Sequence, residues 1–159
     1  MNENSIYLES SVVSYLANRT SRDQLIAVRQ ALTHEWWEHI DKTNVWVSEL
    51  VTLEVARGDE QAAARRLDWI AGLPKIEMHP DALRVSERLI EAGVVPFNEQ
   101  EDALHIALAS LHGFRFLVTW NFSHFVGPEP KLRVMMSLKE WGLNPVLLIT
   151  PEEYLEGGY

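Results

Sequence analysis

The sequence predicts an α/β fold, and three observations support this prediction. Short β-branched and other apolar runs alternate with longer amphipathic stretches along the chain, without internal repeats. The first run, Ile6-Tyr7-Leu8, is apolar throughout, which suits a central parallel strand covered on both faces. The chain has 159 residues, of which 47% are hydrophobic, so it can fill one core but is too short for two ordinary domains. We therefore expect residues 1–159 to form a single domain.

The elements follow in order along the chain. The predicted strands cover residues 6–8, 45–47, 75–78, 116–119 and 146–149. The predicted helices cover residues 11–16, 22–41, 49–57, 59–72, 80–93, 99–112 and 130–141, and a final helix follows residue 150. In the second helix, apolar residues recur at helical spacing: Leu25, Ile26, Val28, Leu32, Trp36 and Trp37.

Local signals support the helix boundaries. Ser10 or Ser11 can accept the first free backbone N–H of the first helix, and Ser48 can cap the third. Pro80 suits the first position of its helix, because proline needs no N–H there. Glycines end several helices, at Gly58, Gly72, Gly93 and Gly113. The last helix begins with a capping-box pattern at residues 150–153.

Composition excludes several classes of chemistry. The chain has no cysteine, which excludes disulfides, thiolate zinc sites and cysteine nucleophiles. Its net charge of −9 gives no global attraction for nucleic acid, so such binding needs a local basic patch or a bound cation. No apolar run approaches the roughly 20 residues of a membrane span, and residues 1–4 lack the basic flank of a secretory signal. We expect a cytoplasmic protein without membrane contact.

Glu9 directly follows the first predicted strand, at its carboxyl end. Ligands of open α/β sheets collect at this edge, so an acid there is a candidate metal ligand or base. The alternative is a solvated glutamate near the N-terminus. Taken alone, the stretch favours that alternative, and only further acids at similar positions can reverse the balance.

Two further acids lie on helices among apolar residues. Glu54 follows Leu50 and Val51 by four and three residues and so shares their face, where it needs a partner such as Arg57 or a site. Asp102 begins a helix that is apolar nearly all round. Asp102 can simply interact favourably with the helix dipole from the first turn. Glu99 and Glu101 can do this from better solvated positions, so we prefer a site role for Asp102.

Asn121 follows the fourth strand and so lies at the same sheet edge as Glu9. An Asn here can shape a turn, or it can offer a neutral oxygen to a hard cation. Thr119 and Ser123 flank it and can position phosphate or water.

Together, Glu9, Glu54, Asp102 and Asn121 are expected to converge. Clustered carboxylates repel one another unless a cation or protons neutralise them. Oxygen ligands without cysteine select hard ions, so we expect Mg²⁺ or Mn²⁺. The corresponding reaction is metal-assisted attack of water on a phosphodiester.

These residues resemble the PIN-domain nucleases, and more narrowly the VapC-type toxins of bacterial type II toxin–antitoxin systems. Four ordered blocks carry the resemblance: Tyr7-Leu8-Glu9-Ser10-Ser11-Val12-Val13-Ser14-Tyr15-Leu16, Val47-Ser48 through Glu54-Val55, Asp102-Ala103-Leu104-His105-Ile106-Ala107, and Leu117-Val118-Thr119-Trp120-Asn121-Phe122. The resemblance implies a three-layer α/β/α sandwich with a mostly parallel sheet. It also implies a Mg²⁺- or Mn²⁺-dependent endoribonuclease, checked by a cognate antitoxin, and a homodimer.

The predicted site assigns Glu9, Glu54, Asp102 and Asn121 as catalytic metal-site residues, with Ser11, Thr119 and Ser123 in support. RNA binding falls to local basic residues: Arg19, Arg22, Arg57 and His124. His105 is interpreted as a packed histidine with one satisfied hydrogen bond, although its spacing from Asp102 can serve a metal.

Two positions depart from the family pattern. Glu9 and Asn121 stand where the family usually has Asp, so Glu9 adds a methylene and Asn121 removes a charge. The alternative function is therefore a catalytically weak or inactive PIN-like protein that binds RNA or a partner. A magnesium phosphatase is less suitable, because Glu9 does not supply the nucleophilic Asp of that chemistry.

Overall fold

The computed structural model describes residues 1–121 and 128–159. The strands are β1 (Ile6–Leu8), β2 (Val45–Ser48), β3 (Lys75–Ile76), β4 (Phe116–Val118) and β5 (Leu147–Ile149). The α-helices are α1 (Ser10–Ala17), α2 (Gln24–His39), α3 (Glu49–Val55), α4 (Glu60–Ile70), α5 (Ala82–Glu91), α6 (Gln100–Leu111), α7 (Pro128–Glu140) and α8 (Pro151–Gly157). A short 3₁₀ turn, Lys42–Asn44, precedes β2.

The five strands form one sheet in the order β3-β2-β1-β4-β5, and every neighbouring pair is parallel. Parallel neighbours need long crossover connections, which the helices supply. β1 is the central strand, and its residues Ile6, Tyr7 and Leu8 are at most 1% exposed. The predicted α/β fold with a parallel sheet is therefore confirmed.

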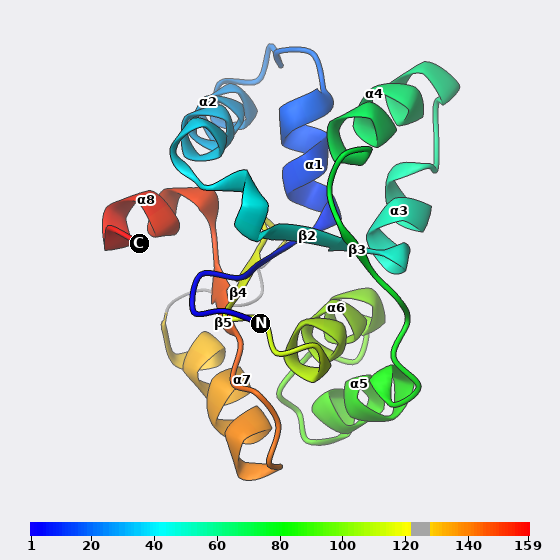
Figure 1. Cartoon of the computed structure of the whole chain (residues 1–159), viewed down its shortest axis with the longest axis vertical. Helices are drawn as coiled ribbons and strands as arrows, with labels where there is room; N and C mark the ends of the chain where they lie inside the picture. The colour runs from blue at the N-terminus through cyan, green and yellow to red at the C-terminus, as the bar shows by residue number, and fades with distance from the viewer. Residues whose placement is uncertain (122–127) are drawn as a thin grey trace.

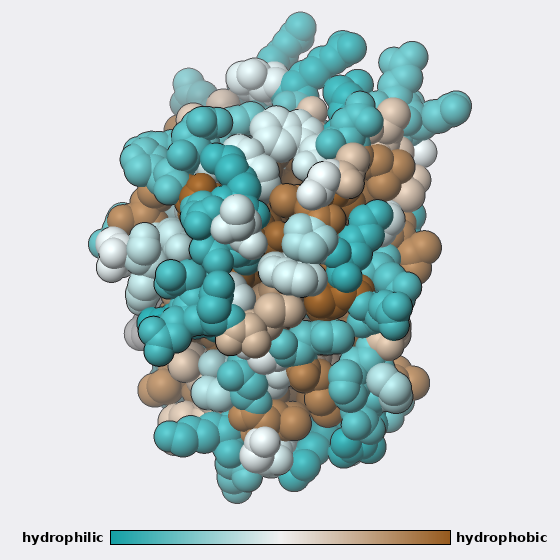
Figure 2. Space-filling view, viewed as in Figure 1, coloured by the Kyte–Doolittle hydropathy of each residue, from teal (hydrophilic) through white to brown (hydrophobic). Residues whose placement is uncertain are grey.

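The helices cover both faces of the sheet, so the chain forms three layers. Figure 1 shows α1 to α4 and α8 on one side of the sheet and α5 to α7 on the other. Between the layers lies one continuous core, which includes Trp36, Phe114 and Leu117. The face seen in Figure 2 is largely covered by hydrophilic residues, with smaller hydrophobic patches between them. Within the described residues, no helix is both long and apolar enough to span a membrane.

The buried face of α2 differs from the sequence prediction. Leu25 and Val28 are 61% and 55% exposed, whereas the polar residues Gln30 and Thr33 are buried. Gln30 is buried because the loop before α2 folds over it: its amide donates to the Arg19 carbonyl (3.0 Å) and its oxygen accepts the Ser21 N–H (2.8 Å). These hydrogen bonds satisfy a buried amide, so a polar residue replaces apolar packing.

The structure confirms two of the predicted helix caps and corrects two other predicted helix starts. Ser48 caps α3 and the capping box of Thr150 and Glu153 is present, as predicted. Two other predictions were wrong. The cap of α1 is the side chain of Glu9, and α5 begins at Ala82 instead of Pro80, after a turn in which Asp81 N–H donates to His79 Nδ1 (3.1 Å).

Candidate metal centre

Glu9 lies where β1 ends beside β4. Leu8 and Val118 are register partners, and the Glu9 N–H donates to the Val118 carbonyl (3.1 Å). Glu9 is 4% exposed, and its Oε2 accepts the Ser11 N–H (3.0 Å), the Ser11 hydroxyl and the Thr119 hydroxyl (2.7 Å). Glu9 therefore both caps α1 and is fixed by the strand next to it.

Glu54 approaches the same sheet edge from the last turn of α3. Its Oε1 accepts the Ser10 hydroxyl and lies 2.6 Å from His105 Nε2, a distance equal to that of the Ser10 bond. Burial raises the pKa of Glu54, but the hydrogen bond and charge of His105, together with further hydrogen bonds such as that from Ser10, outweigh it, so the net shift is downward. The sequence alternative, an ion pair with Arg57, is wrong: Arg57 pairs instead with Glu101, at 3.1 Å.

His105 is 1% exposed and both of its ring nitrogens have partners. Its Nδ1 lies 2.6 Å from the Tyr7 hydroxyl, which in turn lies 2.7 Å from the Ser48 hydroxyl. Burial lowers the pKa of the His105 ring, but the hydrogen bond to Glu54 and the nearby carboxylates raise it by more. The prediction that His105 is packed is confirmed, but its ring has two hydrogen-bond partners instead of the one expected, and one of them is the Glu54 carboxylate.

Glu9, Glu54 and His105 form a compact group in the described part of the chain. Each offers one ligand atom, and these atoms lie within 4.8 Å of one another. The three residues come from the end of β1, from α3 and from α6. A group of this size and composition can hold a divalent cation.

Asp102 lies in the first turn of α6, 6% exposed, and contributes to the same electrostatic field. Burial, together with the charges of Glu9 and Glu99, raises its pKa to about 7. The group with ligand atoms within 4.8 Å contains His105 in place of Asp102. Like charges that raise an acid's pKa indicate a site where a cation is favoured.

Asn121 lies at the expected sheet edge and is exposed, with its backbone N–H donating to Thr119 Oγ1 (2.9 Å). Ser11 and Thr119 lie at the site, where their hydroxyls contact Glu9. Ser123 and His124 fall outside the described residues.

The remaining basic candidates lie at different distances from the acids. Arg57 follows α3 and bridges to the start of α6 through Glu101. Arg19 and Arg22 follow α1, at the end of that helix farthest from Glu9. Eight helical residues span about 12 Å, which separates these two arginines from Glu9.

A model of the PIN-domain family matches residues 6–121, which include the four predicted site residues Glu9, Glu54, Asp102 and Asn121. The chain belongs to the PIN-domain family. No curated protein is a significant match to the sequence.

Solved structures share the PIN fold. A toxin–antitoxin complex from Klebsiella pneumoniae has a chain 17% identical to this one, with a TM-score of 0.60, and the match covers 94% of this chain and 99% of that one. The Sarcin-Ricin loop cleaving toxin VapC20 of Mycobacterium tuberculosis is 19% identical, with a TM-score of 0.54 and coverage of 79% and 98%. VapBC2 of Rickettsia felis, bound to a promoter DNA fragment, is 15% identical, with a TM-score of 0.55 and coverage of 91% and 97%. At these identities the likeness concerns the fold.

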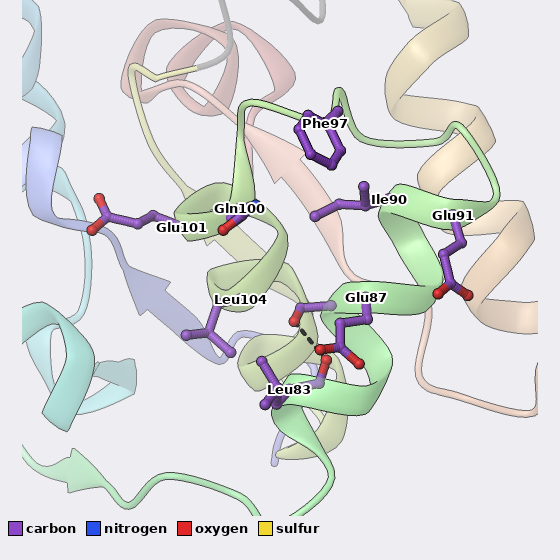
Figure 3. Close-up of a pocket in the computed structure, with 9 residues that line it drawn as sticks. Leu83, Glu87, Ile90, Glu91, Phe97, Gln100, Glu101 and Leu104 are labelled. Atoms are coloured by element: carbon purple, nitrogen blue, oxygen red, sulfur yellow. Dashed lines mark hydrogen bonds between the residues drawn. The ribbon is translucent and has the colours of Figure 1, made fainter.

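This PIN domain also has an apolar groove between α5 and α6, with a volume of about 470 Å³. Figure 3 shows Ile90 and Phe97 near one end of the groove and Leu83 near the other. Phe97 is 80% exposed. The groove contains none of the four acid-site residues, although Glu101 at its rim directly precedes Asp102.

The sequence pattern indicated Ser10 only as a possible helix cap, favoured a packed role for His105 over a metal role, and gave Tyr7 no role beside the acids. The three-residue spacing of Asp102 and His105 was the available signal, because it places both on one face of α6. The contacts of Tyr7 and Ser10 join residues at least 41 positions apart, and local pattern carries no such information.

Proposed function

We propose that this PIN domain is an endoribonuclease that depends on Mg²⁺ or Mn²⁺. The observation that carries the proposal is the convergence of Glu9, Glu54 and His105 within 4.8 Å, with Asp102 in the same field. Such a group at the carboxyl edge of a parallel sheet, in a PIN-domain chain, suits metal-assisted phosphodiester hydrolysis.

The donor set fits a hard divalent cation. The raised pKa of Asp102 shows that a negative charge is unfavourable among these buried carboxylates, so a positive charge would stabilise them. Their oxygen donors suit Mg²⁺ and Mn²⁺. Glu9, Glu54 and Asp102 are the proposed ligands, directly or through water, and Asn121 completes the set. The bound ion would supply a water of lowered pKa and neutralise charge on the phosphate.

The surrounding residues have distinct proposed roles. Ser11 and Thr119 hold Glu9 through its Oε2, which presents the carboxylate in one orientation. Their predicted second task, shared with Ser123, is to orient water or phosphate. Arg57 pairs with Glu101 at the start of α6 and is our first candidate for a phosphate contact; Arg19, Arg22 and His124 are weaker candidates.

We further propose that the protein is the toxin of a toxin–antitoxin pair and acts in the cytoplasm. Structural neighbours described as a toxin–antitoxin complex and as VapBC2 with promoter DNA support a cognate antitoxin as partner. One sheet that takes strands from residue 6 to residue 149 supports a single domain over residues 1–159.

A homodimer is the proposed state of the protein alone. The exposed Phe97 beside the α5–α6 groove is the surface that supports it. Sedimentation of wild type and Phe97→Glu tests this: we expect a dimer for wild type and a monomer for the variant. A monomeric wild type would refute the dimer.

The second candidate function is a PIN-like protein that binds RNA or a partner without cutting. The observation that favours it is Asn121, since a neutral amide at this edge reduces the charge available to a second metal.

Cleavage of single-stranded RNA with Mn²⁺, by wild type and Asp102→Asn, separates the two functions. The nuclease proposal expects cleavage by wild type that falls at least about 100-fold in the variant. Calorimetry with Mn²⁺ adds a second measure. Equal cleavage by both proteins would refute the role of Asp102, and absence of both Mn²⁺ binding and cleavage would favour the binding protein.

A further inference from the structure

We propose that His105 is a positioning residue that fixes the Glu54 carboxylate, and that a buried relay of Ser48 and Tyr7 fixes His105. We call these three residues the Ser48–Tyr7–His105 relay. The inference deepens the proposed function, on which it rests for the role of Glu54. It assigns a task to two buried polar groups, Tyr7 and Ser48, that the metal site itself does not use.

The relay is a continuous line of short hydrogen bonds. Ser48 Oγ lies 2.7 Å from Tyr7 Oη, which lies 2.6 Å from His105 Nδ1. His105 Nε2 then lies 2.6 Å from Glu54 Oε1. Tyr7, Ser48 and His105 are each at most 1% exposed, so protein atoms alone determine their hydrogen bonding.

The Glu54 end of the relay fixes one proton on His105 Nε2. At one end the Val51 N–H, which can only donate, donates to Ser48 Oγ (3.1 Å). At the other end the Glu54 carboxylate, whose pKa is lowered, can only accept. His105 Nε2 therefore carries a proton and donates to Glu54. A neutral His105 ring accepts the Tyr7 hydroxyl proton at Nδ1, whereas a protonated ring donates from Nδ1 to Tyr7 Oη, which then donates to Ser48 Oγ. Burial raises the pKa of the Tyr7 hydroxyl well above its ordinary value, so Tyr7 keeps the proton that it donates.

The position of Glu54 near the end of α3 explains why a supporting hydrogen bond is useful there. Glu54 is in the last turn of α3, and its side chain is only 12% exposed. The relay ties it to β1 through Tyr7 and to α6 through His105, so the carboxylate is held relative to Glu9 and Asp102 together. A carboxylate held in one geometry binds a metal more tightly, and loss of such a supporting hydrogen bond costs about 10- to 100-fold in metal affinity.

Direct metal ligation by His105 is the competing role. His105 Nε2 is within the 4.8 Å group, but ligation requires that this atom lose its proton and its hydrogen bond to Glu54. Positioning keeps the proton on Nε2 when metal is bound. The location of one proton therefore distinguishes the two roles.

The test uses Tyr7→Phe, which removes the hydroxyl that contacts His105 on the side of the ring opposite Glu54. Tyr154→Phe is the matched control, because Tyr154 is also buried but lies on α8. Calorimetry with Mn²⁺ is expected to show at least about 10-fold weaker binding for Tyr7→Phe and wild-type binding for the control. Thermal melting with circular dichroism verifies that both variants fold.

NMR of ¹⁵N-labelled histidine supplies the second readout. We expect the His105 proton on Nε2 in the metal-free protein, retention of this proton at saturating Mg²⁺, and a changed His105 signal in Tyr7→Phe. A folded Tyr7→Phe with unchanged Mn²⁺ affinity, or loss of the Nε2 proton on Mg²⁺ binding, would overturn the inference.

Failure of the proposed function gives a different result. If wild type binds no Mn²⁺ but Tyr7→Phe changes the His105 signal, the metal-site function fails while the relay stands. If wild type binds Mn²⁺ and Tyr7→Phe changes neither affinity nor signal, the relay fails while the proposed function stands.

Discussion

The Thr119 hydroxyl donates to Glu9 Oε2 across 2.7 Å and so joins the ends of β4 and β1. Thr119 is fully buried, and its removal leaves the Glu9 carboxylate with one donor fewer. We predict that Thr119→Val costs about 1–3 kcal/mol of the free energy of unfolding and weakens Mn²⁺ binding about 10-fold. Urea denaturation and calorimetry measure the two effects. Thr119→Ser keeps the hydroxyl and is the control; a Val variant as stable as the Ser variant would contradict the prediction.

Glu9→Asp tests whether the site has adapted to the longer side chain. Three donors surround Glu9 Oε2, and a shorter carboxylate cannot reach them without a shift of the backbone. We predict at least about 10-fold slower RNA cleavage and weaker Mn²⁺ binding in Glu9→Asp. Glu3→Asp, on an exposed residue, is the control. A large gain in cleavage rate would instead mean that the longer side chain of Glu9 makes the natural site less active.

Asp102 makes the stability of the metal-free protein depend on pH. Its pKa is raised from 3.8 to about 7 in the folded protein, so between these values the folded state binds more protons than the unfolded state. Stability therefore falls as pH rises through this window. The raised pKa of His105 acts in the same direction. The lowered pKa of Glu54 acts in the opposite direction: it contributes stability above its ordinary value, and this contribution is lost as pH falls through the lowered pKa.

We predict a melting temperature several degrees lower at about pH 8 than at about pH 5, and a smaller difference in Asp102→Asn. Differential scanning calorimetry in EDTA measures it, with Asp68→Asn on exposed Asp68 as control. Mn²⁺ affinity is expected to increase with pH up to about 7, because binding releases the proton. A variant with the wild-type pH profile would show that Asp102 does not cause it.

Arg57→Ala separates RNA binding from stability. The Arg57–Glu101 pair is 63% and 61% exposed at its side chains, so its loss is expected to cost less than about 1 kcal/mol. If Arg57 contacts phosphate, the variant binds RNA more weakly and the slope of log affinity against log salt falls by about 1.

Fluorescence anisotropy with labelled RNA in EDTA measures this effect. Arg84→Ala is the matched control, because the Arg84–Asp81 pair is similarly exposed and belongs to α5. Equal RNA affinity and equal salt slopes in the two variants would remove Arg57 from the RNA site.

The parts of the fold that follow from local pattern could be predicted from the sequence. An apolar run that ends in an acid placed Glu9 after a strand, and cap preferences located Ser48 and the box at Thr150. The buried face of α2 could not be predicted in this way. Its Gln30 is buried because a neighbouring loop supplies hydrogen bonds, and Leu25 is exposed because no other element covers it in the described structure.

In the candidate site, too, contacts between residues far apart in the sequence could not be predicted. The helical positions of Glu54 and Asp102 indicated that each faces apolar surroundings, which is local information. The partner of Glu54 was not local: Arg57, three residues away, pairs elsewhere, and His105, 51 positions away, takes its place. Asp102 and His105 together mark one face of α6, but only the fold determines that Tyr7 meets that face.

The parallel order of the strands also constrains when the site can exist during synthesis. Glu9 leaves the ribosome early, but its donor Thr119 follows 110 positions later, and β5 pairs with β4 later still. A nascent chain that stops before β4 therefore has the first acid without the strand that orients it. Sequence-distant pairing of this kind also forms slowly. A cell that makes this protein is exposed to an assembled acid site only late in translation, when most of the chain has already emerged.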